Sequence, residues 1–187
     1  MKKSVVRNTV LSGLFIAIAM VLPFLTGQIP QIGSALSPLH IPVLICGFVC
    51  GWPYGLIVGF VTPLLRFVLF GMPPLFPTGV AMAFELAAYG FFTGMLYKLF
   101  PQKIIFIYVN LIISMLAGRV VWGVVRVLIA GLGASEFSWA MFMAGGFVNA
   151  VPGIILHIIL VPLIIIALQK ANLISNNDGI KKSAAQA

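Results

Sequence analysis

The sequence predicts an all-α integral membrane protein, with six transmembrane helices in one bundle and both termini in the cytoplasm. Of its 187 residues, 61% are hydrophobic and only 7% are charged, whereas a soluble domain carries about 25% charged residues. The roughly 114 apolar residues are enough for five or six spans of about 20 residues each. Eleven Lys and Arg stand against three Asp and Glu, so the position of the basic residues can test the number of spans.

The first three spans are separated by segments that contain glycine and proline. The first span follows the basic start of the chain and ends near Leu25; no A-x-A cleavage site follows it, so we expect it to stay in the mature protein. Residues 26–35 form an uncharged loop. Residues 36–70 are too long for one helix, and 51–54 (Gly-Trp-Pro-Tyr) supply a turn that divides them into the second and third spans.

Three further spans follow, at residues 78–97, 104–129 and 139–168. The segment 71–77 contains three prolines and ends the third span. A short basic turn at 98–103 and a loop at 131–136 separate the later spans. Pro152 and Pro162 lie inside the last span and are expected to kink it.

The basic residues outside the spans all fall on one side of a six-span arrangement. They are Lys2, Lys3, Arg7, Lys98, Lys103, Lys170, Lys181 and Lys182. The loops of the other side carry Glu136 and no basic residue. Treating 36–70 as one span would destroy this asymmetry, so the positive-inside rule favours six spans with cytoplasmic termini. We expect residues 1–170 to form the transmembrane domain and 171–187 to be a polar, disordered cytoplasmic tail.

The composition also excludes several functions. The three carboxylates, Glu85, Glu136 and Asp178, offer neither a metal cluster nor a pair for acid–base catalysis. Cys46 and Cys50 lack the C-x-x-C spacing of a redox or zinc site and are expected to be packed side chains. The chain has no phosphate-loop motif, and its net charge of +8 follows the pattern of membrane orientation rather than nucleic-acid binding. We therefore expect no enzymatic activity, no cofactor and no bound metal.

Small residues recur at intervals of four in several spans. The sets are Gly47, Gly51, Gly55 and Gly59; Gly90 and Gly94; and Gly13 with Ala17. Such faces let helix backbones approach closely in lipid, and packing within the bundle explains most of them. For Gly13 and Ala17 the docking of a partner subunit is an alternative, because their face would otherwise contact lipid.

Ionisable residues inside the predicted spans are the main indication of a ligand site, because a charge within the bilayer costs at least about 2.5–3.5 kcal/mol. At about 1.5 Å per residue, these charged residues fall in the outer half of the membrane. Arg119, Trp122 and Arg126 share one helix face. The candidate substrate-binding residues are Arg66, Glu85, Arg119, Trp122, Arg126 and Asn149.

The excess of arginine over glutamate suits a small anionic ligand, because a planar guanidinium binds two oxygens of a carboxylate or phosphate. Two alternatives remain open: Arg126 extends to the outer interface, and Arg66 with Glu85 forms a structural ion pair. His40 and His157 are expected to be packed, hydrogen-bonded residues. The loops 26–35 and 71–77 lie on the outer side and could close over a ligand.

The order of several motifs resembles that of the S components, the substrate-binding subunits of energy-coupling factor (ECF) vitamin transporters. The motifs are LSPLHIPVL at 36–44, the glycine series after it, FGMPP at 70–74 and FELAAYG at 84–90. The resemblance extends over residues 5–170 and is strongest to the pantothenate-type branch; riboflavin, folate and other vitamins remain open.

The resemblance implies a six-helix fold in a bacterial plasma membrane, with an extracellular-side pocket capped by the loop after the first span. It also implies a separate transmembrane coupling subunit and two cytoplasmic ATPases, and transport by toppling of the whole subunit. In the family an A-x-x-x-A face of the first helix docks on the coupling subunit; Gly13 and Ala17 stand at that spacing here. The competing hypothesis is a self-sufficient proton-coupled carrier that uses Glu85, although such carriers usually contain internal repeats and we find none here.

Overall fold

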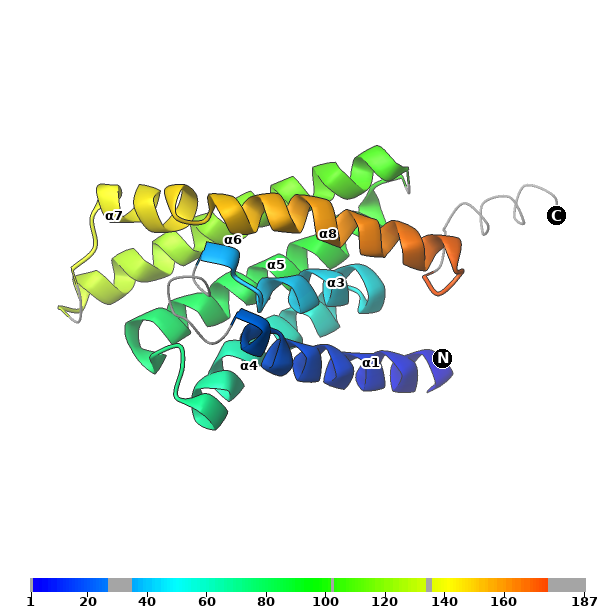
Figure 1. Cartoon of the computed structure of the whole chain (residues 1–187), viewed down its shortest axis with the longest axis horizontal. Helices are drawn as coiled ribbons and strands as arrows, with labels where there is room; N and C mark the ends of the chain where they lie inside the picture. Colours follow the sequence, from blue (N-terminus) through cyan, green and yellow to red (C-terminus); the bar gives the residue numbers. More distant parts are fainter. Residues whose placement is uncertain (1, 27–34, 102, 134–135, 175–187) are drawn as a thin grey trace.

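The computed structural model describes residues 2–26, 35–101, 103–133 and 136–174, and these residues form helices and short connections (Figure 1). The elements are α1 (Lys2–Val21), η1 (Leu22–Thr26), α3 (His40–Cys50), α4 (Trp52–Phe70), η2 (Leu75–Gly79), α5 (Val80–Leu99), α6 (Ile104–Gly131), α7 (Trp139–Met143), η3 (Ala144–Val148) and α8 (Val151–Lys170). No strand occurs in the described ranges, so the all-α prediction is confirmed there.

Within these ranges five helical segments are long and apolar enough to cross a membrane. They cover Ser4–Leu25, Trp52–Phe70, Leu75–Leu99, Ile104–Gly131 and Trp139–Lys170. The sixth apolar helix, α3, has 11 residues and is therefore about 16 Å long, roughly half of a hydrocarbon core of about 30 Å. Almost all of its residues are buried, and Figure 1 shows it in the middle of the bundle.

The sequence placed the helix boundaries well where glycine or proline marks them. The predicted turn at 51–54 is present: Gly51 stands between α3 and α4 with φ of 88°, a backbone conformation that glycine adopts readily. Gly71, with φ of 70°, ends α4 as a left-handed C-cap. The basic turn between α5 and α6 is also confirmed, because α5 ends at Leu99 and α6 begins at Ile104.

The last span is divided into three consecutive segments. After α7, a wider π-helical segment (η3) leads into a turn at Asn149 and Ala150, and α8 begins at Val151. Pro152 lies in the first turn of α8, where its missing N–H costs no helical hydrogen bond. Pro162 lies inside α8, which continues to Lys170.

The glycine series packs α3 and α4 against α5. A Cβ added at Gly90 would overlap the backbone of Gly55, and one at Gly59 would overlap the backbone of Leu86. Gly94 lies equally close to the backbone of Trp52. The predicted role of these glycines in bundle packing is therefore confirmed.

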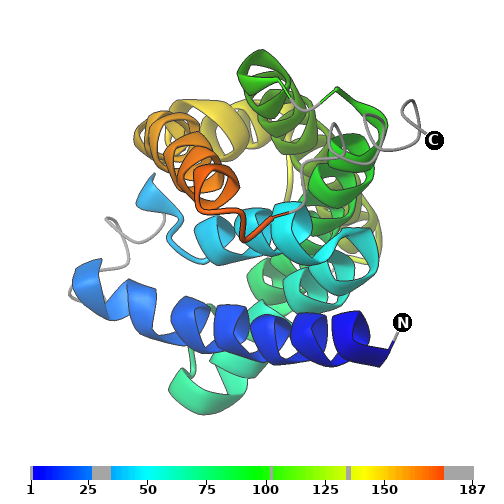
Figure 2. The same cartoon turned by 90° about the vertical axis from the view of Figure 1, so that its right-hand side faces the viewer.

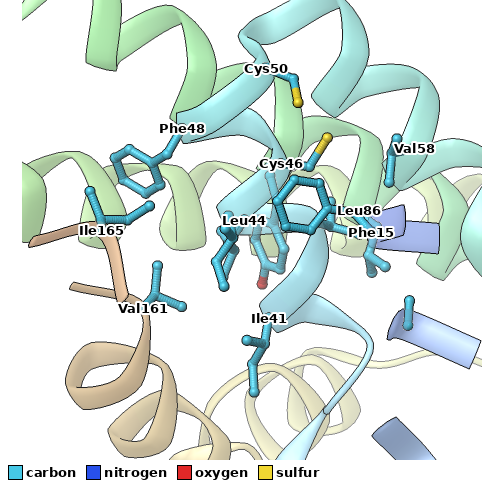
Figure 3. Packing of buried hydrophobic residues seen from close by; sticks show 14 of the residues in the cluster. Phe15, Ile41, Leu44, Cys46, Phe48, Cys50, Val58, Leu86, Val161 and Ile165 are labelled. Carbon is cyan, nitrogen blue, oxygen red and sulfur yellow. The ribbon is translucent and has the colours of Figure 1, made fainter. Parts of the chain in front are cut away.

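The hydrophobic core surrounds α3. Figure 3 shows side chains from α1, α4, α5 and α8, among them Phe15, Leu86 and Ile165, converging on α3. Cys46 and Cys50 are buried free thiols within this core, as the sequence predicted. Because α3 touches most of the other helices, it fixes the position of its first residue, His40, inside the bundle.

Basic residues gather at one end of the bundle, where the N-terminus and the end of α8 lie (Figure 1). Arg7 is near the start of α1, Lys98 and Lys103 flank the turn between α5 and α6, and Lys170 ends α8. We call this the basic end. The predicted alignment of these four residues on one side is therefore present in the fold.

Candidate functional site

Glu85 on α5 and Arg119 on α6 form a buried ion pair. Arg119 Nη1 lies 2.8 Å from Glu85 Oε1, and the two residues are 2% and 8% exposed. Tyr89, one turn along α5, donates a hydrogen bond from its hydroxyl to the same carboxylate oxygen at 2.9 Å. The carboxylate thus has two donors in a region where an unpaired charge would be costly.

Close packing of α5 against α6 brings this pair together. Gly118 precedes Arg119, and a Cβ at that position would overlap the ring of Tyr89. The absence of a side chain at Gly118 therefore lets the Tyr89 ring pack directly against α6. Nearer the basic end, the Asn110 side chain of α6 donates a hydrogen bond to the Thr93 carbonyl oxygen of α5 at 2.9 Å. This bond joins the same two helices.

Two histidines complete the arrangement. His40 Nε2 on α3 lies 3.7 Å from Glu85 Oε1, and the His40 ring stacks on that of His157 from α8, with 5.8 Å between the centroids. We call His40, Glu85, Tyr89, Arg119 and His157 the central polar cluster. Four helices therefore contribute to one buried site.

The two histidines are buried, as predicted from the sequence. Their association with Glu85 could not be predicted, because it depends on the relative position of separate helices, which no spacing in the sequence reveals.

Several polar atoms of the central polar cluster have no hydrogen-bond partner within the described residues. They are His40 Nε2, Arg119 Nε and His157 Nε2. A buried unsatisfied polar group costs about 1–3 kcal/mol. A ligand with hydroxyl, amide or carboxylate groups would offset this cost by pairing with them. Within the described ranges, no group of three His, Cys, Asp or Glu side chains is arranged so that it could hold a metal ion.

Arg66 lies apart from Glu85. Its Nη1 donates to the carbonyl oxygen of Met20 at 3.0 Å, and its guanidinium lies over the rings of Phe24 and Phe70. The hypothesis of a structural Arg66–Glu85 pair is wrong, because Glu85 pairs with Arg119 instead. Arg66 joins the end of α4 to the end of α1, and it is 5% exposed.

Trp122 and Arg126 continue along α6 from Arg119, away from the basic end. Trp122 contacts Phe137 edge-to-face at 5.6 Å between centroids, and the Arg126 guanidinium lies over the same Phe137 ring at 5.1 Å. Arg126 is half-buried, and its Nε has no partner among the described residues. Asn149 is exposed at the junction of η3 and α8. The predicted substrate-binding residues therefore lie in two places: some in the central polar cluster, and the others at the end of the bundle opposite the basic end.

The surroundings of Gly13 and Ala17 differ from those of the other small residues. Both are exposed on α1, and no atom lies within 4 Å of a Cβ built on Gly13. This face therefore takes no part in the packing of the described bundle.

Comparison with known proteins gives one match, which covers most of the chain. Residues 7–165 match the family model described as "ECF transporter, substrate-specific component". No curated protein and no solved structure matches the chain. The matched range contains the central polar cluster and the face of Gly13 and Ala17.

Proposed function

The chain belongs to the family of substrate-specific components of ECF transporters, and we propose that it binds a water-soluble vitamin, pantothenate in the first instance, at the extracellular side of a bacterial plasma membrane. A separate coupling subunit and two ATPase subunits would supply the energy for import. Family membership makes the chain a transporter subunit rather than an enzyme.

The position of the central polar cluster supports an outward-facing site. Arg119 is 15 residues from the start of α6, about 22 Å from the basic end at 1.5 Å per residue. If the positive-inside rule places the basic end in the cytoplasm, the cluster lies in the outer half of the membrane. In this topology both termini are cytoplasmic, and α3, with 11 residues, takes the place of the second predicted span.

The uneven pairing of the arginines is the observation that carries the proposal. Glu85 neutralises Arg119, whereas no ion pair of Arg66 or Arg126 occurs within the described residues. Arg126 contacts an aromatic ring, is half-buried and has an unpaired Nε. A carboxylate such as that of pantothenate would supply the missing counter-charge, and His40 and His157 could bond its hydroxyl and amide groups.

Gly13 and Ala17 provide the second part of the proposal. Their face is exposed and free of neighbours in the described bundle, and small residues let another helix approach closely in lipid. We therefore assign this face to the coupling subunit. The proton-coupled alternative is not favoured: the chain belongs to a family of transporter subunits, and its proposed proton site, Glu85, is held by Arg119 and Tyr89.

Reconstitution tests this division of labour. The chain alone and the chain with a coupling subunit and two ATPases are placed in liposomes, and uptake of radiolabelled pantothenate is measured with and without ATP. The proposal expects binding by the chain alone but uptake only with the complete complex and ATP. Uptake by the chain alone under a pH gradient would favour the carrier instead.

A further inference from the structure

Two hollows in the surface meet at Arg7. A cavity of about 410 Å³ at the basic end is lined by Arg7 and Lys98. A groove of about 640 Å³ is lined by Arg7 at one end and otherwise almost entirely by apolar side chains. One cation therefore borders both a basic cavity and an apolar groove.

The groove lies between α1 and α8, with α3 as its floor. Figure 2, which faces the basic end, shows α1 and α8 apart with α3 between them. Leu11 and Ile18 of α1, which share a helix face with Arg7, line one wall together with Leu22 at the start of η1. From Leu11 to Leu22 the wall is about 16 Å long, close to the roughly 15 Å of one leaflet of the hydrocarbon core.

The cavity has the chemistry of a site for an anionic headgroup. Its lining includes the two cations Arg7 and Lys98, both exposed, and among the described residues no carboxylate lines it. Trp52, Tyr54 and Tyr97 also line it, and such aromatic side chains favour the membrane–water interface. Basic pockets between transmembrane helices on the cytoplasmic side bind anionic lipid headgroups.

We propose that an anionic phospholipid occupies these two hollows, with its phosphate between Arg7 and Lys98 and an acyl chain in the groove between α1 and α8. Charge complementarity favours this occupant: a phospholipid carries an anionic phosphate next to its acyl chains, which matches two cations at one end of an apolar groove. The site is separate from the proposed ligand site, and it does not depend on which solute the chain carries.

The groove and the proposed docking face are neighbours on α1. At about 100° per residue, Gly13 lies about 200° around α1 from Leu11, so Gly13 and Leu11 point to opposite sides of the helix. Leu14, however, lines the groove three residues before Ala17, and residues at that spacing share a helix face. Of the two docking residues, Gly13 is therefore the one whose variants test the docking face apart from the groove.

Native mass spectrometry of the purified full chain tests the headgroup contact. The chain is mixed with equal amounts of phosphatidylglycerol and phosphatidylcholine in detergent micelles, and the lipid that stays bound is identified. We expect preferential retention of phosphatidylglycerol, reduced about fivefold by Arg7→Gln and by Lys98→Gln. Lys170→Gln is the matched control, because Lys170 is an exposed cation of the basic end that lines neither hollow. Equal retention of both lipids, or equal losses in all three variants, would overturn the proposal.

A second pair of variants tests the acyl-chain groove. Ile164 lines the groove, so Ile164→Trp should fill it and reduce retained phosphatidylglycerol severalfold. The neighbouring Leu163 is 62% exposed and lies outside the groove, so Leu163→Trp should leave retention unchanged. If Ile164→Trp leaves lipid retention unchanged but abolishes assembly with the coupling subunit, the groove is a protein interface and the lipid proposal is wrong.

Discussion

Arg119 on α6 holds the carboxylate of Glu85 on α5 at 2.8 Å, and both side chains are buried. The two residues carry opposite charges in a region where either alone would be expensive. A variant of one partner therefore changes folding as well as any ligand contact. For this reason stability and ligand binding have to be measured separately.

Removing one partner of this pair is expected to destabilise the bundle strongly. Arg119→Met leaves the Glu85 carboxylate buried without its cation, and such a loss costs about 3–5 kcal/mol. Thermal unfolding of the purified chain in detergent measures the effect. The double variant Glu85→Gln/Arg119→Met should recover part of the loss, because it removes both charges. If the destabilisation of the double variant equals the sum of the destabilisations of Arg119→Met and Glu85→Gln, the pairing is contradicted.

The contact between Gly90 and Gly55 predicts a second, purely steric effect. Gly90→Ala should destabilise the chain by about 1–3 kcal/mol, the usual cost of overpacking, since the added Cβ would overlap the backbone of α4. Gly13→Ala is the matched control, because Gly13 has open space around it. Unfolding temperatures that fall equally in both variants would show that close helix approach is not the cause.

Larger side chains on the exposed face of α1 should separate assembly from ligand binding. Gly13→Leu and Ala17→Leu are expected to keep vitamin binding by the isolated chain but to prevent its copurification with the coupling subunit. Val120→Leu serves as the control, because Val120 is exposed on α6 rather than on α1. Loss of binding and assembly together would assign Gly13 and Ala17 to packing of the bundle.

Arg126 offers a cleaner test of anion binding than Arg119, because no carboxylate contacts it among the described residues. Arg126→Gln is expected to weaken binding of an anionic vitamin about 10- to 100-fold, the equivalent of one charge-assisted hydrogen bond of roughly 1.5–3 kcal/mol. Isothermal titration calorimetry with pantothenate measures this change, and Lys170→Gln at the basic end is the control. An unchanged affinity would remove Arg126 from the site.

The sequence predicts the helix boundaries because local chemistry determines them. Gly51 and Gly71 adopt positive φ values that favour glycine, so the positions of these turns depend on one or two residues. The length of α3 could not be predicted in the same way. The run from Leu36 is largely apolar, and apolar composition alone does not tell where a helix begins.

The pairing within the site depended on contacts between helices. The sequence placed Glu85 in the same layer as three arginines and suggested Arg66 as its structural partner, whereas Glu85 pairs with Arg119. The choice follows from how closely α6 approaches Tyr89 at Gly118. The histidines His40 and His157 were missed as members of the cluster for the same reason, since each comes from a different helix.

The central claim is that this chain by itself binds a vitamin with an anionic group. Mass spectrometry of the small molecules released from the detergent-purified chain tests it most directly, with Arg126→Gln purified in parallel. The account predicts a stoichiometric carboxylate-bearing vitamin, pantothenate first, that is released from the wild-type chain and depleted in the variant. Recovery of a cationic or uncharged solute, retained equally by both proteins, would contradict it.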